Sequence, residues 1–174
     1  MKNTWLWQLG GWTFTAVLGT LLHFLFDWAG CLALTPISAV NESTWEHMKI
    51  LFFPMLFFAI LQSVFVGKST PNFWWIKLLG ITLGTLLIPI LFYTLGGVFG
   101  KTPGWVNVLI FFLSAGKAYL VECVLFQQQK HVKHPPVLAV IILIVIAVLF
   151  IVFTYAPPPI PLFQDPISRA YGIR

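Results

Sequence analysis

Five apolar segments dominate the sequence and limit what this chain can fold into. A membrane helix needs about 20 mostly apolar residues to cross a hydrocarbon core about 30 Å thick. The segments that meet this length run over residues 7–28, 48–66, 73–98, 105–126 and 137–155. The sequence therefore predicts an all-α, multi-pass transmembrane bundle of five helices, forming a single integral membrane domain over residues 1–174.

Composition supports lipid, rather than water, as the surrounding medium. Hydrophobic residues make up 59% of the chain and charged residues only 9%, against about 25% charged residues in soluble domains. A soluble domain of 174 residues could not bury that much apolar surface, because burial is limited by the ratio of surface to volume. The net charge of +5 comes from basic residues scattered singly, which argues against a nucleic-acid partner.

Short connections with turn residues join the segments, and tryptophans fall near the segment ends, as in an interfacial aromatic belt. With five spans, the N-terminal side carries five lysines and the opposite side carries four basic residues. They are Lys2, Lys68, Lys77, Lys130 and Lys133 against Lys49, Lys101, Arg169 and Arg174. The positive-inside rule then predicts a cell-membrane protein with a cytoplasmic N-terminus and an external C-terminus.

An odd number of spans places the first connection, residues 29–47, on the same membrane face as the C-terminal segment, residues 157–174. Four prolines between residues 157 and 161 prevent this segment from continuing the fifth helix. We therefore expect a Pro-rich tail that folds over that face and covers the first connection.

Polar residues gather at the same face. His23 and Asp27 are four residues apart near the end of the first span, so they share one side of a helix. The stretch Asn41-Glu42-Ser43-Thr44-Trp45-Glu46-His47 comes directly before the second span. Two imidazoles and three carboxylates thus collect where charged groups are costly and are commonly functional.

Two functional hypotheses follow from this cluster. Histidine nitrogens and carboxylate oxygens are ligands for zinc or another divalent metal, which points to His23, Asp27, Glu46 and His47. Alternatively, these residues together with Glu42 act as general acids and bases. The spacing matches no specific metal motif, and we hypothesise that the four candidate ligands converge.

Simpler structural roles stand beside these hypotheses. Ser43 and Glu46 have the spacing of a capping box, in which Ser43 caps the second helix and Glu46 turns back to its N–H. His23 could donate to a carbonyl of a neighbouring helix, and Asp27 could reach interfacial water.

Lys117 and Glu122 form a second polar pair, in the fourth span. Lys117 lies near mid-bilayer, where an unpaired ammonium is costly, so we expect it to snorkel or to face an acid such as Asp27. A separation of five residues places Glu122 on a different face. A structural ion pair and a ligand-binding role both stay open for these two residues.

Small residues also recur in the third span. The pairs Gly80-x3-Gly84 and Gly96-x3-Gly100 permit close helix approach. We interpret both first as packing within the chain and second as an interface between two copies.

The chain resembles an uncharacterised family of small bacterial membrane proteins, the domain of unknown function 6512. The residues that carry the resemblance are Leu22-His23-Phe24 with Asp27, Ser38 to Ser43, Trp45-Glu46-His47, and the ending Phe163-Gln164-Asp165-Pro166 with Tyr171-Gly172-Ile173. The family implies a multi-pass helical membrane protein and supplies no activity. The resemblance also implies that the first connection and the tail, with Asn41, Trp45 and Asp165, belong to one site.

Three classes of function stay open at this point. A membrane-embedded enzyme acting on a lipid or amphiphile would use His23, Glu46 and His47, with or without a metal. A small transporter would use the cluster as a gate, with Lys117 or Glu122 deeper along its path, and five spans suggest that it would form a homo-oligomer. A structural subunit would use the cluster only for packing. An enzyme needs convergent groups and a lateral opening to lipid, whereas a transporter needs a continuous polar route.

Overall fold

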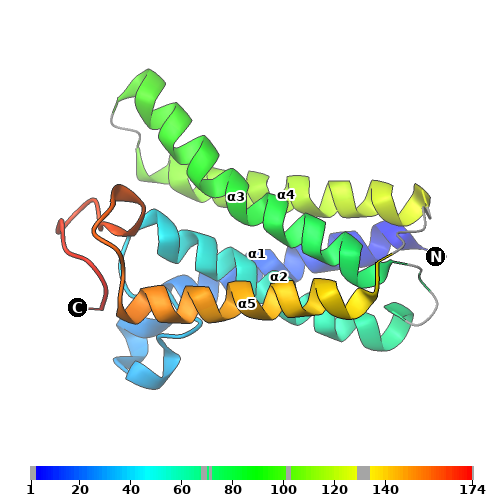
Figure 1. Ribbon diagram of the computed structural model, residues 1–174. Coiled ribbons are helices and arrows are strands. Elements are labelled where there is room, and N and C mark those ends of the chain that lie inside the picture. The colour runs from blue at the N-terminus through cyan, green and yellow to red at the C-terminus, as the bar shows by residue number, and fades with distance from the viewer. Residues whose placement is uncertain (1–2, 68–69, 71, 101–102, 129–133, 174) are drawn as a thin grey trace.

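Five long helices form the structure (Figure 1). The computed structural model describes residues 3–67, 70, 72–100, 103–128 and 134–173. The helices are α1 (Thr4–Ala29), α2 (Thr44–Val66), α3 (Phe73–Phe99), α4 (Gly104–Gln128) and α5 (Pro136–Tyr155). Each is long and apolar enough to cross a membrane. The predicted fold class is confirmed, and the chain is a multi-pass membrane protein.

The remaining described elements are short. The 3₁₀ turn η1 (Leu32–Leu34) lies in the first connection, and η3 (Pro161–Phe163) lies in the tail. A single bridge pairs Gln164 with Tyr171, and the described residues contain no β-strand. Gly30 ends α1 in the left-handed conformation, with φ of 58°, which is why a glycine suits this position.

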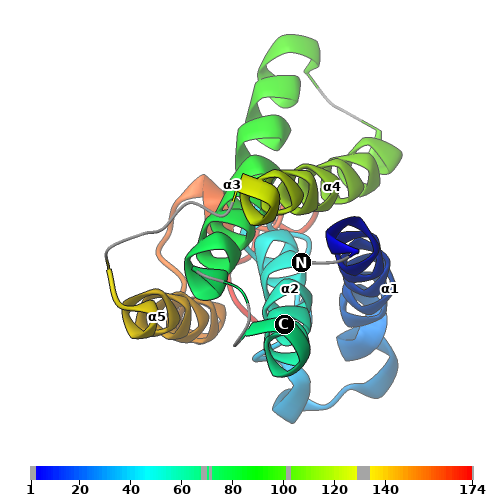
Figure 2. The same cartoon turned by 90° about the vertical axis from the view of Figure 1, so that its right-hand side faces the viewer.

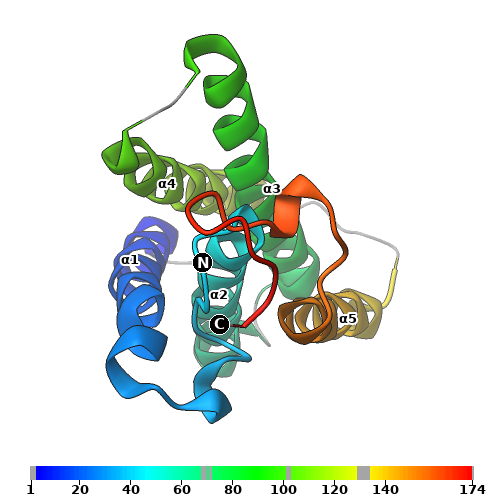
Figure 3. The same cartoon turned by 90° about the vertical axis from the view of Figure 1, so that its left-hand side faces the viewer.

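Helix α2 lies at the centre of the bundle and is the most buried of the five spans. It packs between α1 and α5, while α3 and α4 cover it from one side (Figures 2 and 3). The end of α3 on the tail side diverges from the other helices (Figure 1). Helix α5 buries a narrow face formed by Ala139, Leu143, Phe150 and Thr154. Ile142, Ile146, Ala147 and Ile151 flank this face and also pack against the core.

The two glycine pairs of α3 have different surroundings. A Cβ atom at Gly80 would collide with the Glu122 side chain, and one at Gly84 would lie 3.0 Å from the Ala118 Cβ atom. These two glycines therefore let α3 and α4 approach closely, as expected. Gly96 and Gly100 have no neighbour among the described residues within 4 Å of such an atom, so the prediction that this second pair packs within the chain is wrong.

A buried ion pair joins α3 to α4. The Lys77 ammonium donates to the Glu122 carboxylate, and both side chains are almost fully buried. The Lys77 nitrogen also lies 5.5–5.9 Å from the ring centres of Phe58, Phe73, Tyr119 and Phe126. A charge at this depth is tolerated because it is paired and faces aromatic rings.

The tail folds back over the beginning of α2, as predicted (Figure 3). The Trp45 ring packs between Phe150 of α5 and Phe163 of the tail, with ring centres 4.5 and 4.7 Å away. Gly172 has φ of 73°, a conformation that favours glycine, and its carbonyl accepts a hydrogen bond from the Asn41 side chain at 2.9 Å. The first connection and the tail are therefore in direct contact.

Candidate functional site

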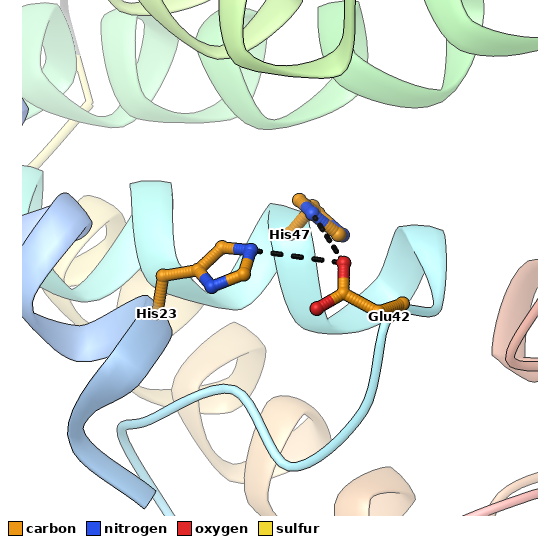
Figure 4. A group of neighbouring side chains, drawn as sticks. All are labelled: His23, Glu42 and His47. Carbon is orange, nitrogen blue, oxygen red and sulfur yellow. Dashed lines mark ion pairs between the residues drawn. The ribbon is translucent and has the colours of Figure 1, made fainter. Parts of the chain in front are cut away.

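Three side chains, one from the first connection and two from helices, converge at the end of the bundle where α3 diverges. His23 lies on α1, His47 lies in the first turn of α2, and Glu42 lies in the connection between them (Figure 4). The Glu42 Oε2 atom is 3.7 Å from His23 Nε2 and 3.6 Å from His47 Nε2. One ligand atom from each of the three residues lies within 4.8 Å of the other two.

The orientation of His47 is fixed by its own helix turn. Its Nδ1 atom lies 2.9 Å from the Ser43 carbonyl oxygen, so Nδ1–H is the donor and Nε2 keeps a free lone pair. Ser43 caps α2, because its hydroxyl accepts a hydrogen bond from the Glu46 N–H at 3.4 Å. The cap fixes where the helix starts, and this start directs the His47 Nε2 atom toward Glu42.

Several hydrogen bonds hold the first connection on both sides of Glu42. The Ala39 N–H donates to the Leu22 carbonyl of α1 at 3.1 Å, one residue before His23. The Asn41 side chain accepts from the Ser43 N–H at 2.8 Å and donates to Gly172 in the tail. Asn41 therefore occupies the role in the capping box that we expected for Glu46, and it links the cluster to the tail.

Glu46 lies outside the cluster, so the expectation that it converges with the histidines is wrong. Its carboxylate is buried and paired with the Lys49 ammonium. It also accepts hydrogen bonds from Thr154 of α5 at 3.0 Å and from the Val40 N–H at 3.2 Å. The Lys49 ammonium donates to the Thr35 carbonyl and to the Thr154 hydroxyl, both at 2.8 Å. Glu46 thus holds the first connection, α2 and α5 together.

A small pocket opens beside the cluster, between the beginning of α2 and the α3–α4 pair. Its volume of about 20 Å³ is enough for about one water molecule. Glu42, Thr44, His47 and Asn107 supply its polar wall, and Ile88, Phe92, Ile110 and Phe111 supply its apolar wall. The side-chain amide oxygen of Asn107 is buried and has no hydrogen-bond donor among the described residues.

The other predicted site residues lie apart from the cluster. Asp27 is exposed and lies outside the group of three, so the expectation that it joins the histidines is wrong. Lys117 is also exposed, which excludes one of its two expected positions, beside an acid inside the bundle, and is compatible with the other, snorkelling. Glu122 pairs with Lys77 instead. Asp165 is buried in the tail, where its carboxylate accepts from the Ile167 and Ser168 N–H groups.

Sequence reasoning missed three polar residues: Lys49 and Thr154, which bind Glu46, and Asn107, which lines the pocket beside the cluster. Lys49 follows Glu46 by three residues, a spacing that allows a helical ion pair, so it could have been found. Thr154 lies 108 residues from Glu46 in sequence, and no local pattern links the two. Asn107 lies in the apolar first half of α4 with no local motif around it, and only the packing of α4 brings it to the pocket.

Two imidazole nitrogens and one carboxylate oxygen that face a common point form a donor set suited to a divalent metal ion such as Zn²⁺. All three side chains are partly exposed, so an ion could reach them from the membrane surface. The fold defines a multi-pass membrane protein, and the His/Glu cluster is its candidate functional site.

The chain belongs to the family of unknown function DUF6512, whose model matches residues 1–173. This result agrees with the resemblance noted from the sequence. No curated protein and no solved structure matches the chain.

Proposed function

We propose that this protein is a membrane-embedded, metal-dependent hydrolase that acts on a lipid or another amphiphile. His23, Glu42 and His47 would hold the ion, and the small pocket would hold the water that reacts. This proposal replaces Asp27 and Glu46 of the sequence-based ligand set with Glu42.

The distances within the cluster carry this proposal. Separations of 3.6 and 3.7 Å between Glu42 and the two imidazoles are too long for hydrogen bonds, which span about 2.7–3.2 Å. Zinc ligands lie about 2.0–2.2 Å from the ion, so two ligands of one ion are separated by no more than about 4.4 Å. The two carboxylate–imidazole distances fit a shared ion better than they fit direct hydrogen bonds.

The number of protein ligands supports catalysis over a purely structural role. Structural zinc sites are closed by four protein ligands, whereas catalytic sites have three and keep one position for water. A metal ion bound here would lower the pKa of its water ligand to about 7 and so supply hydroxide. The side-chain amide oxygen of Asn107 lies in the pocket wall without a donor among the described residues, and it is an acceptor that can orient this water.

The surroundings favour an amphiphilic substrate. The pocket has an apolar wall on α3 and α4, and the cluster lies toward the membrane face, where the polar group of an amphiphile is found. In the proposed reaction, water adds across an ester bond. Its hydroxyl group joins the acyl carbon, the carbon–oxygen bond breaks, and the remaining proton goes to the leaving alkoxide.

Metal content tests the site first. We expect about one zinc ion per chain after the purified protein is loaded with Zn²⁺ and desalted, measured by elemental analysis, because three ligands make a catalytic-type site. The double variant His23→Ala/His47→Ala should lose this ion while it remains folded. Asp27→Asn, which changes an exposed carboxylate on the same helix, is the matched control and should keep the ion. Equal metal content in the double variant and the wild type would refute the site.

Hydrolysis of a model ester tests the activity separately. The zinc-loaded protein in micelles should cleave a long-chain p-nitrophenyl ester faster than p-nitrophenyl acetate, and Glu42→Gln should abolish this cleavage. Stoichiometric zinc without cleavage of either ester would mean that the metal is structural and that the enzymatic proposal is wrong.

A further inference from the structure

We propose that a groove between α1 and α4, on the opposite side of the membrane from the His/Glu cluster, binds the ester region of a bilayer lipid. This inference is independent of the metal site. It rests on the shape of the groove, on one buried amide without a partner, and on the depth of that amide in the membrane.

The groove is large enough for part of a lipid and opens outward. Its volume of about 420 Å³ lies within the range of about 300–1,000 Å³ that is usual for ligand pockets. Its walls are almost entirely apolar, and its rim includes Trp5 and Leu120, which are 59% and 63% exposed. The lining residues are Trp5, Gln8, Leu9, Trp12, Gly116, Tyr119, Leu120 and Cys123. Because both α1 and α4 are membrane spans, the groove opens to lipid.

Gln8 is the unsatisfied polar group of this groove. Its side chain is 4% exposed, and neither its amide nitrogen nor its amide oxygen has a hydrogen-bond partner among the described residues. A buried amide without a partner is costly, and lipid offers no water to satisfy it. Tyr119 already shares a 2.8 Å hydrogen bond with Thr15, and the Trp12 indole N–H already donates to the Phe112 carbonyl oxygen at 3.3 Å. The N–H group of the Gln8 amide therefore stays available to an acceptor of a groove ligand, and the rest of the groove offers mainly apolar contacts.

The position of Gln8 along α1 favours an ester lipid as the ligand. Gln8 lies four residues after the first residue of α1, or about 6 Å along the helix axis, and Trp12 lies about 12 Å along it. Trp5 and Trp7 at the helix start mark the membrane interface. An acceptor just inside the interface, followed by apolar groups at greater depth, matches the carbonyl oxygen of a fatty-acyl ester and its chain.

Gly116 keeps the groove open on the α4 side. A Cβ atom at this position would meet only the Trp12 indole, at 3.5 and 3.9 Å. A methyl group would be accommodated, but a larger side chain would extend over Trp12 and fill the groove. Position 116 therefore allows the groove to be closed without disturbing the core.

Retained lipid, measured by native mass spectrometry, tests this site. The protein is released from micelles that contain equal amounts of a diacyl phosphatidylcholine and its dialkyl ether analogue, which lacks the carbonyl acceptors. We expect the wild type to retain the diacyl lipid over the ether by about three- to tenfold, the ratio that one hydrogen bond in a membrane provides. Gln8→Leu should bring this ratio to about one.

Two further variants keep the test decisive. Gln62→Leu removes the other buried glutamine whose amide atoms have no partner among the described residues but which does not line the groove, so it should leave the ratio unchanged. Gly116→Leu should reduce the adducts of both lipids. An unchanged ratio in Gln8→Leu would refute the proposal. So would crosslinking of Cys123 between two chains in the lipid-containing micelles, because the groove would then hold a second copy.

Discussion

At the scale of single residues, the bundle carries two lysines that are almost completely buried, and each is neutralised by one acid. Lys49 pairs with Glu46 near the tail side, and Lys77 pairs with Glu122 toward the opposite side. Removing water from such a pair costs free energy that the attraction between the charges only partly recovers. The Lys77–Glu122 pair therefore specifies that α3 meets α4 more than it stabilises the bundle, whereas the Glu46–Lys49 pair lies within α2 and reaches α5 through Thr154.

Breaking the Lys77–Glu122 pair should be more damaging than removing both charges. Glu122→Gln leaves a buried ammonium without a counter-charge, and we expect a loss of about 3–5 kcal/mol in the free energy of unfolding. The double variant Lys77→Met/Glu122→Gln should recover most of that loss. Thermal unfolding in detergent micelles measures both.

Lys117→Met is the matched control for this experiment, because Lys117 is an exposed lysine on the same helix as Glu122. It should cause no loss of stability. A double variant as unstable as Glu122→Gln would show that the aromatic rings around Lys77, rather than its acid, make the ammonium necessary.

The residues of the site were only partly predictable from the sequence. His23, Glu42 and His47 were all candidates, because polar residues at the ends of apolar segments stand out. Which of them converge depends on the rotation of each helix, and the two glutamates four residues apart illustrate this. Glu42 lies before the first turn of α2 and faces the histidines, whereas Glu46 lies within that turn and faces Lys49.

At the scale of whole elements, α3 has one glycine pair in a close contact with its neighbours and a second pair on an open surface. A Cβ atom added to Gly84 would lie 3.0 Å from Ala118 and 3.2 Å from Leu51, whereas one added to Gly96 would face open space. We expect Gly84→Leu to lower the free energy of unfolding by about 1–3 kcal/mol, because the two helices would have to separate.

Gly96→Leu, the same change about three turns further along α3, should leave thermal stability unchanged or raise it, because leucine favours helix more than glycine does. Destabilisation by Gly96→Leu that increases as the protein is concentrated would instead indicate that the diverging end of α3 packs against a second copy.

The helices themselves were predictable because lipid imposes their length and composition. Their ends were less so: α2 begins at Thr44, four residues before the predicted span, because the polar first turn is capped by Ser43 and buried by the tail. A prediction from hydropathy alone leaves this turn out of the helix, because the turn contains Glu46 and His47.

At the scale of the whole molecule, the contact between the first connection and the tail requires both to lie on one membrane face. Both cysteines are free, and Cys31 is exposed in the first connection. In a Cys123→Ser background, we expect a membrane-impermeant maleimide to label Cys31 in intact cells. An Ile167→Cys variant that also lacks Cys31 should be labelled equally, because Ile167 is 77% exposed in the tail.

These two positions test different aspects of the topology. Labelling of both only after the membrane is permeabilised would reverse the predicted orientation, which rests on a small excess of lysines on the N-terminal side. Labelling of the two from opposite sides of the membrane would contradict an odd number of spans.

The contact between Asn41 and Gly172 also sets the order in which the protein is completed during its synthesis. The first connection leaves the ribosome before α2 to α5 exist, whereas Thr154 and Gly172, which hold it in place, are made after four helices have been inserted. Until then, Glu46 and Lys49 have each other but not Thr154, and the Glu42 loop has no attachment to the tail. The newly made chain therefore attaches the loop that carries Glu42 to the tail only as its last step.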